Sequence, residues 1–156
     1  RRHPCRRKKR GLLVGKTRRG AATKIMAIAD RSGLPISATI ASGERSEVRL
    51  AEDVVEQRFT AEKPQRLIGD KAYDSAQLEK DLAAQDIELI SPTRRTTRSR
   101  WQDGRPLRRY KRRWKVERLF AWLLRFRRLT NRYESKAENF LGFLHLGCLV
   151  ILLRHL

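Results

Sequence analysis

Two strand-like runs joined by a short turn constrain the fold of this chain more than any other feature of its sequence. The runs are residues 23–30 (TKIMAIAD) and residues 34–42 (LPISATIAS). Between them Arg31, Ser32 and Gly33 supply turn chemistry, because glycine adopts backbone conformations that other residues avoid. Strands connected by so few residues pair antiparallel, so the sequence predicts a β-hairpin.

Helix and strand patterns alternate after this hairpin. Apolar residues recur at helical spacing over residues 47–59, and another helix is predicted from Ser75, a suitable N-cap residue, through Ala84. Short strand-like segments stand at residues 66–69 (RLIG) and residues 87–90 (IELI). This alternation predicts helices packed in layers on a sheet.

Two helices are predicted at the end of the chain. A polar, basic loop is expected over residues 93–106. Helical spacing then covers residues 107–125, breaks near residues 130–133 and resumes over residues 136–154. The apolar run at residues 140–153 is too short to span a bilayer and is interpreted as a buried helix. With 156 residues in all, the sequence predicts a single mixed α/β domain.

The net charge limits the partners of such a domain. The chain has 37 Lys and Arg against 17 Asp and Glu, a formal net charge of +20. A charge of this size attracts polyanions, most often nucleic acid, although a ribosomal or membrane-surface role is an alternative. Residues 1–20 contain many basic residues and no acid, so we expect a basic arm or mobile loop there.

The cysteines and the N-terminal residues indicate the compartment. Cys5 and Cys148 form neither a metal-binding spacing nor a disulfide framework. The charged N-terminus is not followed by the apolar stretch of a secretory signal. These features predict a protein of the reducing cytoplasm that does not enter the membrane.

Asp70 stands where a predicted strand ends, in the segment RLIGDKAYDS. Catalytic and ligand-binding groups of open α/β sheets lie at strand ends, and Gly69 permits close approach of another group. Asp74 is explained more simply as a turn or capping residue, and Lys71 and Tyr73 as surface residues or phosphate contacts. A solvated loop acid remains an alternative interpretation of Asp70.

A second candidate acid is Glu117, in the predicted helix over residues 107–125. It lies at the edge of an apolar stripe, and Tyr110 and Arg113 project from the same helix face, seven and four residues earlier. Arg and Tyr can hold a carboxylate in place through their donors. An ordinary ion pair between Arg113 and Glu117 is the alternative; together with Asp70, however, the pattern indicates a metal site for phosphate chemistry.

These segments resemble a known family. IGDKAYDS, RRYKRRWKVERLFAWL, FRRLTNRYE, AENFLGFLHLGCLVILLR and KIMAIADRSGLPI are similar to segments of bacterial insertion-sequence transposases of the DDE type. The group that the chain resembles most is the IS-five group of the wider IS-four class. The resemblance covers about residues 16–156.

The resemblance implies a ribonuclease-H-like catalytic domain over residues 21–156, a mixed sheet flanked by helices. Such domains use three carboxylates and two Mg²⁺ (or Mn²⁺) ions. The second aspartate of the family corresponds to Asp70, and its Tyr-x2-Arg-x3-Glu signature to Tyr110, Arg113 and Glu117. The lysine that ends this signature is replaced by Leu124, beside Arg125.

The first aspartate of the family has no counterpart in this chain. No acid precedes Asp30, and in the family layout Asp30 falls at the hairpin turn, so it is not assigned as catalytic. The N-terminal first strand is therefore expected to be missing, and the chain is interpreted as the C-terminal portion of the catalytic domain. A truncated gene copy would explain this, as would an upstream reading frame joined by frameshifting.

The activity implied by the resemblance is DNA cleavage and joining at insertion-sequence ends by metal-dependent phosphoryl transfer. The partners would be the terminal inverted repeats, the target DNA and further copies of the protein, at the nucleoid. Trp101 and Trp114 are either base-stacking residues or, respectively, a loop anchor and a core residue. The residues expected to contact DNA are Lys71, Arg94, Arg95, Arg98, Arg100, Arg108, Arg109, Arg112 and Arg125.

Two alternatives to an active transposase remain. A catalytically inactive DNA-binding remnant would bind DNA without depending on a divalent metal, and the absent first aspartate favours it for the isolated chain. A basic structural protein that binds RNA would leave the lone Glu117 on the face of Tyr110 and Arg113 unexplained.

Overall fold

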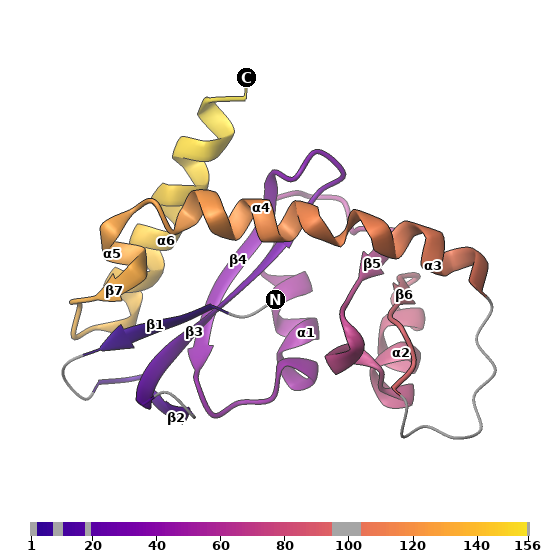
Figure 1. Cartoon of the computed structure of the whole chain (residues 1–156), viewed down its shortest axis with the longest axis horizontal. Coiled ribbons are helices and arrows are strands. Elements are labelled where there is room, and N and C mark those ends of the chain that lie inside the picture. The colour runs from indigo at the N-terminus through magenta and orange to yellow at the C-terminus, as the bar shows by residue number, and fades with distance from the viewer. Residues whose placement is uncertain (1–2, 8–10, 18–19, 95–103, 156) are drawn as a thin grey trace.

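The computed structural model describes residues 3–7, 11–17, 20–94 and 104–155 (Figure 1). A mixed α/β fold, as predicted, is confirmed. The elements follow in the order β1 (His3–Arg7), β2 (Gly15–Thr17), β3 (Gly20–Ala29), β4 (Pro35–Ser42), α1 (Glu47–Glu56), β5 (Arg66–Ile68), the 3₁₀ turn η1 (Lys71–Tyr73), α2 (Ala76–Ala83), β6 (Glu88–Ile90), α3 (Gly104–Tyr110), η2 (Lys111–Arg113), α4 (Trp114–Leu123), α5 (Arg127–Thr130), β7 (Asn131–Arg132) and α6 (Ala137–Leu153).

The predicted β-hairpin forms one side of the larger sheet, with β3 in the interior and β4 at the edge. β3 and β4 pair antiparallel from Thr23↔Ser42 to Ala29↔Pro35. At the turn, the Asp30 carboxylate accepts hydrogen bonds from the amides of Ser32 and Leu34. Gly33 has a φ of +84°, a conformation that suits glycine, so the turn chemistry expected from the sequence is present.

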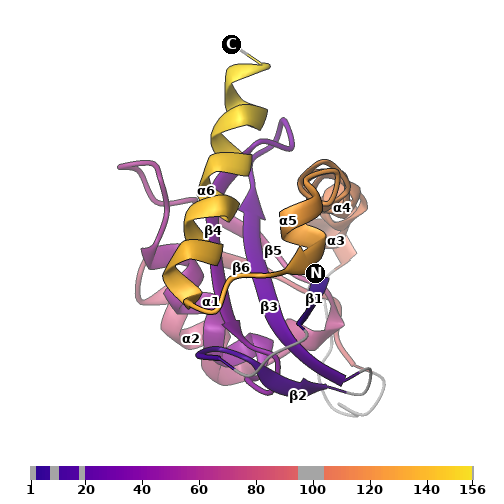
Figure 2. The ribbon, with the colours of Figure 1, turned by 90° about the vertical axis from the view of Figure 1, so that its left-hand side faces the viewer.

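Alternation along the hairpin divides the core between the two faces of the sheet. Ile25 and Ile40 face α4 and α6, where they pack with Leu119, Phe120 and Phe140. Met26 and Ala41 face the other way, toward Leu50 and Val54 of α1. Figure 2 shows α1 and α6 on opposite sides of the hairpin. The hairpin is therefore the middle layer of the molecule.

The basic N-terminal segment differs from the arm expected over residues 1–20. β1 pairs antiparallel with β3 from His3↔Ile25 to Arg6↔Ala22 and parallel with β7, and β2 pairs with the start of β3. Strand pairing uses backbone groups and does not require basic side chains to be buried, so the charge density did not exclude it. A strand therefore occupies the N-terminal position. Its sequence, HPCRR, contains no acid.

The described residues form two sheets and not a single one. β5 and β6 pair parallel with each other, and α2 packs on this pair. The N-cap at Ser75 is confirmed, since its hydroxyl accepts a hydrogen bond from the Leu78 amide. The first predicted helix ends at Glu56, earlier than expected, because the Phe59 amide instead donates to the carbonyl of Ile36 on β4.

The helix expected over residues 107–125 begins earlier and is interrupted. α3, η2 and α4 form a nearly continuous rod that crosses in front of the hairpin in Figure 1, and it reaches into the predicted loop by starting at Gly104. The break near residues 130–133 and the last helix agree with the prediction, with α5 and β7 at the break. None of the helices in the described ranges is long and apolar enough to cross a membrane.

Candidate active site

A cavity of about 580 Å³ lies where the two sheets and the α3–α4 rod meet. Residues 26–29 of β3 line one part of it, β5 and the following Gly69 another, and the rod contributes side chains such as Arg113 and Val116. Three carboxylates line this cavity: Asp30, Glu62 and Asp70. Basic groups from the rod, Arg109, Arg112, Arg113 and Lys115, line it as well. Acid and base therefore meet in one concave site, as phosphate chemistry requires.

Asp70 occupies the end of β5, as the sequence predicted. The Gly69 amide still pairs with the carbonyl of Ile90, and the chain then leaves the sheet at Asp70. The carboxylate of Asp70 caps η1, because its Oδ1 accepts a hydrogen bond of 2.7 Å from the Ala72 amide. Within the described residues Oδ2 has no hydrogen-bond partner. One oxygen of Asp70 therefore orients the side chain while the other is available to a ligand.

Gly69 is required for this turn. A Cβ at this position would lie 3.0 Å from Cβ, Cγ and Cδ2 of Tyr73, closer than side-chain carbons ordinarily approach. The close approach expected from the sequence is therefore made by the ring of Tyr73. This packing places Tyr73 beside Asp70 in the wall of the cavity.

Arg94, which we expected to contact DNA, holds the turn from outside. Its Nε donates to the carbonyl of Lys71 at 2.8 Å and its Nη2 to the carbonyl of Ala72 at 2.7 Å. The Arg94 amide also donates to the carboxylate of Asp74 at 2.7 Å. This positioning role was not predictable from the sequence, because the partners lie about twenty residues apart. A basic residue that follows a neighbouring strand is the signal that could have suggested it.

The predicted ridge of Tyr110, Arg113 and Glu117 is present on the rod. Arg113 donates through Nη1 to the Tyr110 hydroxyl at 2.8 Å, and its Nη2 lies 3.3 Å from Oε1 of Glu117. About a third of the Arg113 and Glu117 side chains is exposed, so the pair borders solvent. Arg113 also lines the cavity, whose lining includes Asp70 but not Glu117. Arg113 thus joins Glu117 to the cavity that contains Asp70.

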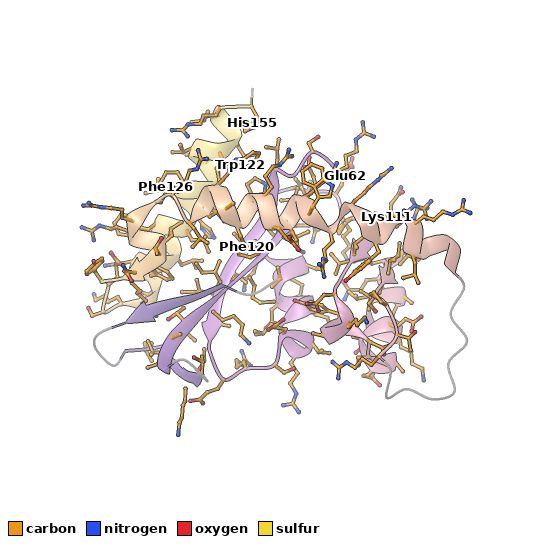
Figure 3. The ribbon with its side chains drawn as sticks, viewed as in Figure 1. Glu62, Lys111, Phe120, Trp122, Phe126 and His155 are labelled. Carbon is orange, nitrogen blue, oxygen red and sulfur yellow. The ribbon has the colours of Figure 1, made fainter. Side chains whose placement is uncertain are left out.

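Asp30 and Glu62 were not assigned as site residues. The geometry of Asp30 agrees with a structural role at the turn, because its Oδ1 accepts hydrogen bonds from the amides of Ser32 and Leu34. It nevertheless lines the same cavity as Asp70. Glu62 belongs to the loop between α1 and β5 and is labelled in Figure 3 close to the rod. Proximity in space, which the sequence does not display, brings both acids to the site.

The carboxylates of Asp70 and Glu117 suit a divalent metal in their chemistry but do not form a complete set of ligands. Carboxylate oxygens are the ligands that Mg²⁺ and Mn²⁺ prefer, and Asp70 has an oxygen available. Among the described residues, however, no group of three or more His, Cys, Asp or Glu is arranged to hold a metal ion. The chemistry of Asp70 and Glu117 suits the ion, and a complete set of ligands requires at least one more group.

The expected DNA-contacting residues fall into three sets. Lys71, Arg108, Arg109, Arg112 and Arg125 are exposed; three of them lie along the rod, and Arg125 follows its end. Arg94 is exposed but engaged with the turn, as described above. Arg95, Arg98, Arg100 and Trp101 lie outside the described residues.

Trp114 is half exposed, which argues against the core position that was one of its two interpretations. The guanidinium of Arg118 lies 4.8 Å from the ring centroids of both Trp114 and Trp122. Figure 3 shows Trp122 and its neighbour His155 where the rod meets the end of α6; their rings are 5.0 Å apart. Trp114 is thus the exposed end of a row of aromatic and cationic groups, suited to stack on a base.

Comparison with known proteins identifies the class. The model of the transposase DDE domain family matches residues 5–153, so the chain belongs to this family. It is 30% identical, over 132 residues, to a protein assigned as a transposase for insertion sequence element IS402 in Burkholderia cepacia. That alignment covers 80% of this chain and 59% of the relative, so the chain spans about three fifths of the relative's length.

A second relative is nearer in length. It is assigned as a transposase for insertion sequence element IS6501 in Brucella ovis, and it is 31% identical over 137 residues, 85% of this chain and 98% of the relative. No solved structure matches the chain. The resemblance inferred from the sequence motifs is therefore confirmed at the level of the DDE transposase family.

Proposed function

We propose that this chain carries part of the centre that cuts and joins DNA at the ends of an insertion sequence of the IS-five group within the IS-four class. The observation that supports the proposal most is Arg113, which contacts Glu117 and lines the cavity that contains Asp70. Asp70 thus lines this basic, concave site, and Glu117 is linked to it through Arg113. Its substrate is double-stranded DNA, namely terminal inverted repeats and target, in the cytoplasm at the nucleoid.

In this proposal Asp70 and Glu117 hold Mg²⁺ or Mn²⁺. When bound, two such ions activate the attacking oxygen and stabilise the leaving oxygen of a phosphodiester. The residues of the chain have separate tasks. The Ala72 amide fixes Asp70, Arg113 and Tyr110 fix Glu117, and the cations of the rod hold the phosphate backbone in register.

A third carboxylate is needed, and the proposal assigns it to a segment upstream of Arg1. β1 pairs with β3 as far as Ile25, and in the described part of the chain no strand pairs with Met26–Ala29 along that edge. Met26–Ala29 line the same cavity as Asp70. A strand extending β1 backwards would pair with this stretch and bring its side chains to the cavity that contains Asp70. An upstream reading-frame product or a longer form of the chain would provide it.

The test is cleavage of a terminal-repeat oligonucleotide by the protein with its upstream segment restored. Asp70→Asn and Glu117→Gln are each expected to lower the Mg²⁺-dependent rate by about 100-fold or more, because each removes a metal ligand. Glu56→Gln, the same change on an exposed residue of α1, is the matched control and should leave the rate unchanged. An unchanged rate for Glu117→Gln would place the centre elsewhere.

A DNA-binding remnant without catalysis is the second candidate, favoured for the isolated chain because HPCRR of β1 contains no acid. It predicts DNA binding that ignores divalent metal and weakens steeply with salt, by about one power of salt concentration per phosphate contact. Cleavage by the restored protein decides between the two candidates.

A further inference from the structure

One face of α6 is apolar and exposed to solvent. The exposed fractions of Leu146, Leu149 and Leu153 are 56%, 49% and 59%. At 100° per residue these leucines and Gly142 fall within an arc of about 60° on the helix surface. We call Gly142, Leu146, Leu149 and Leu153 the α6 stripe. Isolated exposed leucines are ordinary, but four aligned apolar positions on one helix form a continuous surface.

The α6 stripe is separate from the core of the domain. The buried side of the helix, with Phe140, Leu144 and Ile151, packs on the hairpin and on the rod. At 100° per residue the stripe is centred about 180° from that side. Both views show the C-terminal part of α6 projecting beyond the rest of the molecule (Figures 1 and 2). The stripe is therefore accessible to another molecule along its length.

The spacing and charge of the stripe indicate what that molecule is. Its residues stand 4, 3 and 4 positions apart, the spacing of a helix–helix seam. From Ala137 through Leu153 the helix contains no Lys or Arg, although the whole chain has a net charge of +20. This face is thus a place where two copies can meet with little repulsion, and it is poorly suited to DNA.

Gly142 fixes the direction of such a pairing. A Cβ at Gly142 would meet no atom within 4 Å, so the helix surface has open space at this position for a side chain of another molecule. When two α6 helices run antiparallel about the point between Leu146 and Leu149, Leu153 of each copy lies opposite Gly142 of the other, and Leu146 lies opposite Leu149. A parallel arrangement would instead oppose two glycines.

The ends of the helix favour the same arrangement. Glu138 is the acidic residue in the first turn of α6, and Arg154 follows its last turn. In an antiparallel pair the first turn of one helix lies beside the last turn of its partner, so the acid of each copy is near the base of the other. The helix dipoles also oppose each other favourably.

We propose that the α6 stripe binds the α6 stripe of a second copy of this chain, as an antiparallel helix pair. Three leucines a side form a small interface, at the low end of stable protein contacts. The pair is consequently weak in solution and is strengthened when two copies bind neighbouring sites on one DNA molecule.

The first experiment is sedimentation equilibrium in high salt without DNA or divalent metal, so its result is independent of the proposed catalytic function. We expect a reversible monomer–dimer equilibrium whose dissociation constant rises by about tenfold or more in Leu146→Lys. Leu12→Lys is the matched control, because Leu12 is 77% exposed and lies far from α6 in the chain. That control should leave the equilibrium unchanged.

Gly142→Trp guards against misfolding. The open space at Gly142 accepts a side chain, so this variant should melt at the temperature of the wild type or above it, yet fail to dimerise. The proposal would be overturned by a wild-type protein that stays monomeric at all concentrations. This holds whether the monomer binds neutral lipid vesicles or binds nothing. The proposal would also be overturned by a dimer that neither Leu146→Lys nor Gly142→Trp weakens.

Disulfide trapping tests the direction. In a background of Cys5→Ser and Cys148→Ala, chains with Leu146→Cys are mixed with chains with Leu149→Cys and oxidised. The antiparallel pair predicts cross-linked heterodimers in excess of either homodimer. An excess of homodimers would indicate a parallel pair and contradict the arrangement.

Discussion

The two sheets of the molecule are held together by different kinds of contact. The hairpin of β3 and β4 packs on α4 and α6 through a cluster that includes twelve buried residues, whereas the β5–β6 pair shares with α1 and α2 a cluster that includes five. The turn that holds Asp70 relies on polar contacts from Arg94, Ala72 and Asp74. The larger apolar cluster, which we call the apolar frame, therefore positions the rod, whereas Asp70 is held by a few local hydrogen bonds.

A buried cation strengthens the larger part. Arg132 of β7 is 2% exposed, and its Nη1 donates to the hydroxyl of Thr23 at 2.5 Å while its Nε donates to the carbonyl of Glu134 at 3.1 Å. Its guanidinium also lies over the ring of Phe140, 5.4 Å from the centroid. A guanidinium paired in this way fastens the break between α5 and α6 to the centre of the sheet.

The largest effect is expected from the apolar frame. Phe140→Ala should lower the free energy of unfolding by about 3–5 kcal/mol, because its fully buried ring leaves a cavity between α6 and the hairpin. Leu82→Ala, the counterpart in the smaller cluster, should lower amide protection mainly in β5, α2 and β6. Urea unfolding with hydrogen exchange measures both. If both variants lowered amide protection equally across the whole molecule, the two clusters would not be energetically distinct.

A smaller effect is expected at the glycine before Asp70. Gly69→Ala should destabilise the protein by about 1–3 kcal/mol, since the new methyl group collides with the ring of Tyr73. Gly142→Ala is the matched control, because open space surrounds that position and alanine favours a helix by up to about 1 kcal/mol over glycine. Thermal unfolding of both variants compares the effect of a methyl group at a crowded and at an open position. An unchanged melting temperature for Gly69→Ala would show that the ring of Tyr73 can move aside.

Arg94→Met should act locally. Its loss removes two hydrogen bonds to the carbonyls of Lys71 and Ala72, so amides of the η1 turn should exchange faster by about tenfold, with little change in melting temperature. Native-state hydrogen exchange resolves the effect. A fall in melting temperature as large as that of Phe140→Ala would mean that the turn belongs to the frame.

The fold and the site were predictable where the determining contacts are local. The hairpin followed from its turn, and the ridge on the rod followed from spacings of three and four residues between Tyr110, Arg113 and Glu117. The pairing of β1 with β3 and the grip of Arg94 on the turn were not predictable. These contacts join residues far apart in the chain and use backbone groups, which every residue type provides.

The smallest effect is expected where α1 and α2 join the two parts. Desolvation, followed by repulsion from the carboxylate of Asp81, raises the pKa of Glu52 above its ordinary value. A carboxyl whose pKa is raised by folding stabilises the protein below its unfolded pKa, and this contribution disappears as the pH rises through the folded pKa. Glu52→Gln should therefore slightly raise the melting temperature at neutral pH and not at pH 3. A lower melting temperature of Glu52→Gln at neutral pH would contradict repulsion between Glu52 and Asp81.

The proposed function depends above all on Asp70 and Glu117 binding a divalent metal together. The most direct measurement is anomalous diffraction from crystals of the chain with the upstream segment restored, grown with Mn²⁺ and DNA ends. We expect a Mn²⁺ peak within coordination distance of a carboxylate oxygen from each residue, and loss of that peak in Asp70→Asn. Mn²⁺ bound elsewhere, with neither carboxylate as ligand, would contradict it.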